Sequence, residues 1–191
     1  ITTRLVGSEM CIRDRYKKGS VMSKTIVVYF SHVGENYING RIVNISEGNT
    51  RIVAEKIQKL LNCDIFEIKT VQSYPVDYNE TVDLAKKELS SGFRPEIKEN
   101  IDLSDYITIY IGYPNWWETM PTAVFSFLEE KDLSGKIIKP FCTHEGSGMG
   151  HSEKDLKEIC KFSVVENGLA LYGSKVRESD KIIESWIKEE R

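Results

Sequence analysis

Between residues 24 and 188 the chain alternates short apolar segments with amphipathic segments five times. The apolar segments are nearly continuous in hydrophobic residues, which is typical of strands buried on both faces of a parallel sheet. The amphipathic segments repeat apolar residues at helical spacing, so each can cover one face of such a sheet. We therefore expect an α/β domain, a doubly wound three-layer sandwich with a five-stranded parallel sheet.

The expected strands are Thr25–Phe30, Asp64–Lys69, Tyr106–Ile111, Lys136–Cys142 and Ser163–Tyr172, the last as one strand or a bent pair. The helices are expected to begin near Thr50, Tyr78, Thr119, Ser152 and Ser179, with Thr119 and Ser152 as caps. The expected inward residues are Val53, Ile57, Leu60 and Leu61 in the first helix, Val124, Phe125 and Leu128 in the third, and Ile182, Ile183, Trp186 and Ile187 in the last.

Residues 1–21 do not share this periodicity, and Val6–Arg15 resembles a translated sequencing-adapter read-through. We expect Met22 to be the biological start, residues 1–21 to be a non-native or disordered leader, and residues 22–191 to form a single domain. The leader carries five basic and two acidic side chains, so removing it leaves 21 basic and 27 acidic residues and a net charge of −6. This balance argues against a nucleic-acid partner and favours basic proteins that dock on an acidic face.

No apolar run approaches the roughly 20 residues of a membrane-spanning helix, and the N-terminus is charged where a signal peptide is apolar. A cytoplasmic protein without membrane partners is the resulting expectation. The cysteines Cys11, Cys63, Cys142 and Cys160 show no CxxC spacing, so we expect inert thiols rather than disulfides or structural zinc.

Cys142, His144 and His151 are candidate metal ligands, but His151 follows a flexible glycine-rich loop, and we expect no metal. A Cys142–His144 nucleophile pair lacks an identifiable third residue to orient the base. No catalytic residue is therefore assigned.

The loop after the first strand offers Ser31 and, further along, Ser46, Gly48, Asn49 and Thr50 at the start of a helix. A helix N-terminus has unpaired N–H groups and a positive partial charge, so hydroxyls and a glycine there suit a phosphate. The chain lacks GxxxxGK[ST], which argues against an NTPase and for a phosphate held as an anchor. An ordinary capped helix is the alternative.

Two more loops follow expected strands at the same edge of the sheet, where doubly wound folds bind ligands. Gly112–Thr119 contains Trp116 and Trp117, which can stack on a flat ring. Alternatively, Trp116 packs under the next helix and Trp117 makes a dimer contact. Thr143–Gly150 is rich in glycine, whose backbone can approach a ligand closely.

With these three loops, Lys24 to about Lys188 resembles a short-chain flavodoxin. The resemblance implies the strand order 2-1-3-4-5 and bound FMN, whose phosphate lies on the first loop and whose ring lies between the other two. The implied cofactor-binding residues are Ser31, His32, Gly48, Asn49, Thr50, Tyr113, Pro114, Asn115, Trp116, Trp117, Thr143, His144, Glu145, Gly146, Ser147 and Gly148.

The chain departs from the family at residues 33–47, which separate Ser31 from Gly48 where the family motif is compact. This insertion can fold over the phosphate or the ribityl chain, with Asn36, Tyr37 or Arg41 as contacts, or it can be a decorative surface loop. The departure leaves open the role of His32 and whether Ser46 replaces a missing threonine.

The resemblance implies an electron-transfer protein that shuttles low-potential electrons between redox partners, as a monomer or weak dimer. The alternative is an NAD(P)H-dependent FMN reductase for quinones or similar acceptors, with His144, Tyr113 and the insertion beside the ring. The short chain and the lack of a visible nicotinamide-binding motif favour the carrier. A phosphate-binding regulatory module without flavin is a third possibility.

Overall fold

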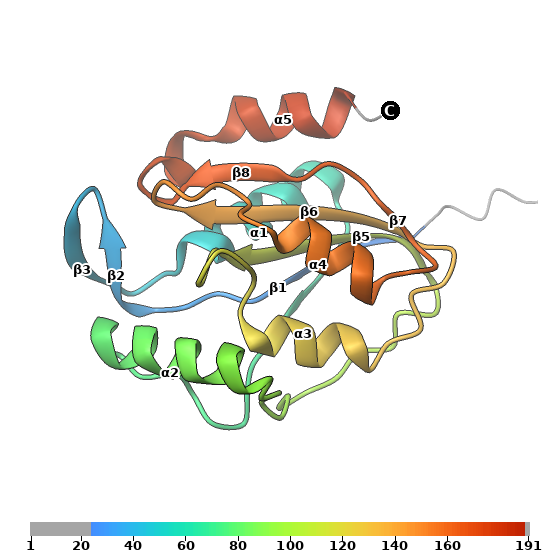
Figure 1. The fold of residues 1–191 in the computed structure, drawn as a ribbon. Helices are drawn as coiled ribbons and strands as arrows, with labels where there is room; N and C mark the ends of the chain where they lie inside the picture. The colour runs from blue at the N-terminus through green and yellow to red at the C-terminus, as the bar shows by residue number, and fades with distance from the viewer. Residues whose placement is uncertain (1–23, 190–191) are drawn as a thin grey trace, which may run out of the picture.

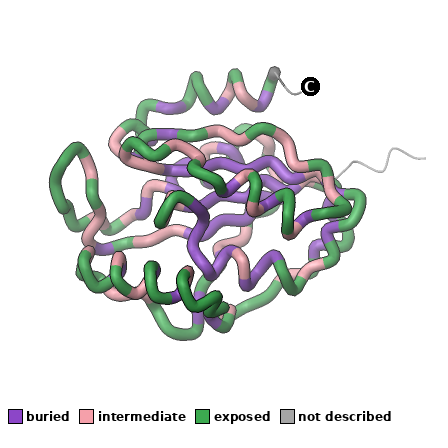
Figure 2. Tube along the Cα trace, viewed as in Figure 1, coloured by how far each residue is buried: buried purple, intermediate pink, exposed green. Residues whose placement is uncertain are grey.

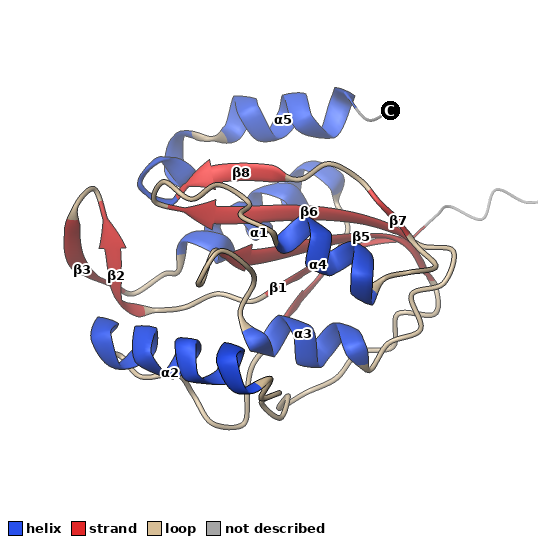
Figure 3. Ribbon diagram, viewed as in Figure 1, coloured by secondary structure: helices blue, strands red, loops and turns tan. Residues whose placement is uncertain are grey.

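A computed structural model describes residues 24–189, so the expected leader and Cys11 lie outside the described residues. The middle layer is a parallel sheet in the order β4-β1-β5-β6-β7, and β8 continues beside β6 after β7. This is the expected order 2-1-3-4-5, with the fifth position filled by a bent pair, and it confirms the doubly wound α/β fold (Figures 1 and 3). The sheet strands are β1 (Lys24–Tyr29), β4 (Asp64–Glu67), β5 (Tyr106–Pro114), β6 (Ile137–His144), β7 (Val164–Val165) and β8 (Leu169–Tyr172).

Helices cover both faces of the sheet. α1 (Asn49–Leu61) and α5 (Asp180–Glu189) lie on one face, and α2 (Tyr78–Ser91), α3 (Thr122–Glu129) and α4 (Ser152–Ile159) lie on the other (Figure 1). A 3-10 helix, η2 (Gly173–Glu178), joins β8 to α5. Across residues 24–189, every helix is too short or too polar to cross a bilayer.

The core divides into two apolar layers because successive strand residues face opposite sides of the sheet. Val27 and Tyr29 of β1 pack with α1 and α5, whereas Ile26 and Val28 pack on the side of α3 and α4. Figure 2 shows this burial concentrated in the sheet and the inner helix faces. The near-continuous apolar strands of the sequence thus reflect burial on both faces.

The insertion after β1 forms a regular antiparallel hairpin of β2 (Gly34–Ile38) and β3 (Arg41–Ile45). Asn39 and Gly40 at its tip both have positive φ, 51° and 79°. Two left-handed residues make the turn that matches the twist of a hairpin, and Asn-Gly is the dipeptide that favours it. The insertion is therefore a structured arm standing at the carboxyl edge of the sheet (Figure 1).

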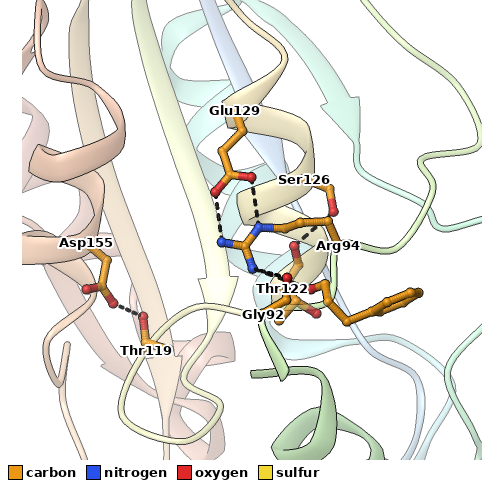
Figure 4. A network of polar contacts seen from close by, with 8 residues as sticks. Gly92, Arg94, Thr119, Thr122, Ser126, Glu129 and Asp155 are labelled. Carbon is orange, nitrogen blue, oxygen red and sulfur yellow. Dashed lines mark hydrogen bonds and ion pairs between the residues drawn. The ribbon is translucent and has the colours of Figure 1, made fainter. Parts of the chain in front are cut away.

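The predicted caps were wrong. α3 begins after Pro121, and the Thr119 hydroxyl instead donates to Asp155 Oδ2 at 2.5 Å (Figure 4). Ser152 is already helical; its hydroxyl donates to the Met149 carbonyl and accepts from the Tyr113 hydroxyl. Both hydroxyls find partners from distant segments, which local capping rules do not register.

Two predicted core residues were also wrong. Leu60 is 45% exposed and Ile182 is 54% exposed, whereas Leu61 and Ile183 pack into the apolar layer between the sheet and the helices α1 and α5.

On the other face of the sheet, Arg94 makes a two-pronged ion pair with Glu129 that ties the chain after α2 to α3 (Figure 4).

Truncating two residues of α1 tests this assignment. Ile57→Ala removes a fully buried side chain and should lower the free energy of unfolding by about 2–5 kcal/mol. Leu60→Ala on the same helix should change it by less than about 0.5 kcal/mol, because Leu60 is exposed. Urea denaturation monitored by circular dichroism measures both, and equal losses would contradict the assigned face.

Candidate functional site

The two ends of the hairpin insertion meet at the start of α1. The backbone N–H of Arg51 donates to Ser31 Oγ at 3.1 Å, across the insertion. A Cβ on Gly48 would lie 2.1 Å from Ser31 Oγ and 2.6 Å from the His32 carbonyl oxygen, so only glycine fits there. The insertion therefore leaves and rejoins the loop at one point, so that Ser31 and Gly48 lie side by side although 16 residues separate them in the sequence.

The first turn of α1 has free hydrogen-bond donors. Within residues 24–189, the backbone N–H groups of Asn49 and Thr50 have no protein partner. They lie beside the Ser31 hydroxyl at the positive end of a 13-residue helix. This arrangement suits an anionic group such as a phosphate.

A buried hydroxyl pair joins the first and third of the predicted loops. Thr50 Oγ1 and Thr143 Oγ1 share a hydrogen bond of 2.8 Å, and both residues are almost fully buried. Because β6 ends just beyond Thr143, this bond fixes the following glycine-rich loop against the start of α1.

The adjacent tryptophans have different environments. Trp116 is half-buried and makes edge-to-face contacts with Phe30, His32 and Tyr74, at ring-centroid distances of 5.5, 5.7 and 5.0 Å. Trp117 is 42% exposed and leans on α2, where its indole N–H donates to the Val82 carbonyl at 3.0 Å. Lys86 lies over the Trp117 ring, 4.9 Å from its centroid.

The turn that carries Trp117 has a strained backbone. Trp117 and Glu118 have φ values of 53° and 65°, and Trp116 pairs with Thr119 across them. Positive φ is unusual for such residues. The Glu118 carbonyl accepts from the His151 N–H at 2.7 Å, and a Cβ on Gly150 would lie 2.1 Å from that oxygen. The end of the glycine-rich loop, at Gly150 and His151, thus packs against the turn at Trp117 and Glu118 and stabilises it.

Glu145, in the loop after β6, binds the tip of the hairpin. One of its carboxylate oxygens accepts from the N–H of Asn39 at the hairpin tip, at 3.2 Å. The other accepts from the N–H of Ser174 in η2, at 2.7 Å. At the hairpin base, the Glu35 carboxylate accepts from the N–H of Tyr78 at the start of α2, at 3.0 Å. The hairpin is therefore held at both ends.

These elements enclose a cavity of about 630 Å³ at the carboxyl edge of the sheet. Twelve predicted site residues line it: His32, Asn49, Thr50, Pro114, Asn115, Trp116, Trp117, Thr143, His144, Glu145, Gly146 and Ser147. Ser31, Gly48 and Gly148 do not line it, although Ser31 and Gly48 contact each other at the start of α1 and the Gly148 carbonyl accepts from the Asn115 amide. Tyr113 is fully buried, bonded to Ser152, and lies behind the wall.

Sequence reasoning missed part of the lining. The hairpin contributes Asn36 and Tyr37 to the lining, but Arg41 and Ser46 do not line the cavity. Glu35 and Glu118 lie in the insertion and the tryptophan loop but were not predicted individually, and no pattern indicated Tyr78, Thr81, Val82, Ala85 or Gly173. The helical spacing of Tyr78, Val82 and Ala85 shows one face of α2, but a sequence alone does not say that this face borders a cavity.

The ionisable groups at the cavity are acidic or neutral. Glu35, Glu118 and Glu145 line it, and no Lys or Arg does so among the described residues. Burial lowers the pKa of His32 and of His144. The His32 Nε2 atom is buried without a partner in the described structure. An anion held here relies on N–H and hydroxyl donors instead of a cation.

Cys142 of the Cys142–His144 pair is a buried thiol. Cys142 is 1% exposed, and burial raises the pKa of its thiol, which keeps it protonated. Within residues 24–189, no group of three or more His, Cys, Asp or Glu side chains is placed to hold a metal ion.

The comparisons with known proteins agree with this geometry. The profile of a family described as Flavodoxin matches residues 41–190. A Bacteroides eggerthii structure assigned as a flavoprotein is 29% identical with a TM-score of 0.70, and a Bacteroides uniformis one is 28% identical with 0.69. The alignments cover 87% of this chain in both cases, and 96% and 98% of those chains.

A Lactobacillus acidophilus flavoprotein, solved in complex with FMN, is 24% identical over 82% of this chain and 97% of its own, with a TM-score of 0.58. Among curated protein sequences, none matches significantly. Because the family profile spans most of the chain, the protein belongs to the flavodoxin family.

Proposed function

We propose that this protein binds FMN in the cavity and transfers low-potential electrons between redox partners. The observation that carries the proposal is the pairing of two features in one cavity. The unpartnered N–H groups of Asn49 and Thr50 can hold a phosphate, and the indole rings of Trp116 and Trp117 lie on another wall. The FMN complex of the Lactobacillus acidophilus flavoprotein supports this reading.

The residues present fit FMN. Gly48 has no side chain and lies against Ser31, so the Ser31 hydroxyl is held beside the start of α1, where a phosphate can bind. His32 has a buried ring nitrogen, Nε2, without a partner among the described residues. Asn115 and the backbone at Gly146 can contact polar edges of a ring held between the two loops. When bound, FMN supplies reversible electron-transfer chemistry.

The chain's charges set the electrostatics of the site. Glu35, Glu118 and Glu145 carry negative charge at the cavity, and no lining Lys or Arg offsets them. Negative charge added to a ring beside them is disfavoured by Coulomb repulsion, which corresponds to a low reduction potential. The net charge of −6 outside the first 21 residues supports docking of basic redox proteins.

Cofactor titration tests the proposal directly. The purified full chain should be yellow and bind about one FMN per chain, with the phosphate at the start of α1. Absorbance and quenching of FMN fluorescence measure the stoichiometry and affinity. A protein that neither retains nor takes up FMN would refute the assignment.

Gly48→Ala tests the phosphate anchor. A Cβ 2.1 Å from Ser31 Oγ must push the loop away from α1, so FMN affinity should fall by about tenfold or more while riboflavin affinity changes less. Gly135→Ala is the control: a Cβ there meets no atom within 4 Å, and the cost of an alanine at its φ of +72° falls on stability away from the cavity lining. An equal effect on FMN and riboflavin would argue against a phosphate at this helix start.

The buried histidine predicts a pH dependence. His32 has a lowered pKa in the folded protein, so the unfolded chain binds the proton first as the pH falls below about 6.5. Its contribution to apoprotein stability is therefore present near neutral pH and is lost on acidification. His32→Asn should show a smaller drop in urea midpoint than the parent between about pH 7.5 and pH 5. Parallel drops would show that His32 is not the titrating group.

A further inference from the structure

The cavity has a second wall that the three flavodoxin loops do not supply. Glu35, Asn36 and Tyr37 of β2 form it together with Tyr78, Thr81 and Val82 of α2, and we call it the hairpin–α2 wall. It belongs to the same cavity as the loop segments 114–118 and 143–147. A ring contacted by those loops therefore does not account for the whole lining.

The hairpin–α2 wall is a fixed surface. The Glu35 N–H donates to the Val76 carbonyl at 2.8 Å, and the Glu35 carboxylate accepts from the N–H of Tyr78. A Cβ on Gly34 would lie 2.9 Å from the Val76 carbonyl oxygen, so β2 packs closely on the chain entering α2. The hairpin tip is bound to Glu145, so contacts at both ends of the hairpin hold the wall.

Aromatic rings give the wall its chemistry. Tyr37 and Tyr78, from different elements, lie with ring centroids 6.3 Å apart and planes inclined by 32°. Trp117 joins the wall through its bond to the Val82 carbonyl. Flat rings with polar edges contact other flat rings favourably, and phenol hydroxyls can donate to a ligand's carbonyl oxygens.

The charges restrict the ligand. Glu35 lies in the wall, Glu118 and Glu145 lie nearby, and no Lys or Arg among the described residues lines the cavity. An anionic second ligand, such as a nicotinamide dinucleotide with its phosphates, would face carboxylates without a compensating cation. A neutral planar ring meets no such penalty.

We propose that the hairpin–α2 wall is a second ligand subsite that takes a neutral planar aromatic molecule with ring carbonyls, the chemistry of a quinone. The inference rests on the proposed function, because it assigns the remaining part of the cavity to FMN. The proposed subsite gives the hairpin insertion a role in binding a second small molecule. A protein that only carries electrons between other proteins does not require such a subsite.

Equilibrium binding without turnover tests the subsite. The FMN content of the full chain is measured first by absorbance, and 2-methyl-1,4-naphthoquinone is then titrated by calorimetry into the oxidised protein. It should bind without releasing FMN. Tyr37→Ala and Tyr78→Ala should each weaken its binding by about tenfold, the loss of one ring contact and its buried area, and should weaken FMN binding less. Phe162→Ala, which removes a ring that is 79% exposed and outside the cavity lining, should change neither affinity.

Three results would overturn the subsite: no binding of the naphthoquinone, displacement of FMN by it, or tyrosine variants that lose FMN while binding the naphthoquinone normally. Equally tight binding of NADH would overturn the restriction to neutral ligands. A chain that takes up no FMN would refute the proposed function alone. Tyrosine-dependent binding of the naphthoquinone to that FMN-free chain would still support the hairpin–α2 wall.

Discussion

The close approach of Gly48 to the Ser31 hydroxyl and the His32 carbonyl is the constraint on which the site depends. A side chain at position 48 has no room, since a Cβ would lie 2.1 Å from Ser31 Oγ. Because the chain closes on itself there, the insertion adds an arm without moving the start of α1 away from the end of β1. A closed excursion of this size costs little additional chain entropy, because closure entropy grows only with the logarithm of loop length.

The arm gains its position from two carboxylates. Glu35 anchors its base to the start of α2, and Glu145 holds its tip against the loop after β6. Each carboxylate accepts from a backbone N–H that a turn or helix end leaves free. The hairpin is thus joined both to α2 and to the loop after β6, and all three contribute to one cavity. Neither of these two hydrogen-bond contacts belongs to the parallel sheet.

The fold was predictable because burial on both faces of the strands and on one face of each helix leaves a periodic signal. The three loops were predictable because the carboxyl ends of parallel strands meet at one edge. The hairpin had a local signal, Asn39-Gly40, but its contact with Glu145 joins residues 106 positions apart and has no local signature. Thr119 and Ser152 failed as caps for the same reason, since Asp155 and Tyr113 compete for their hydroxyls.

The distribution of charge around the cavity favours one orientation of a ligand over the reverse. At one end, the N–H groups at the start of α1 attract an anion, and the Ser31 and Thr50 hydroxyls reinforce the polarity of that end. Elsewhere around the cavity, Glu35 and Glu118 repel one. A molecule with a phosphate at one end and a neutral ring at the other has a single favourable orientation in such a field. Within the proposed function, the carboxylates that fix this orientation also oppose added negative charge on the ring, so binding direction and low potential have one electrostatic cause.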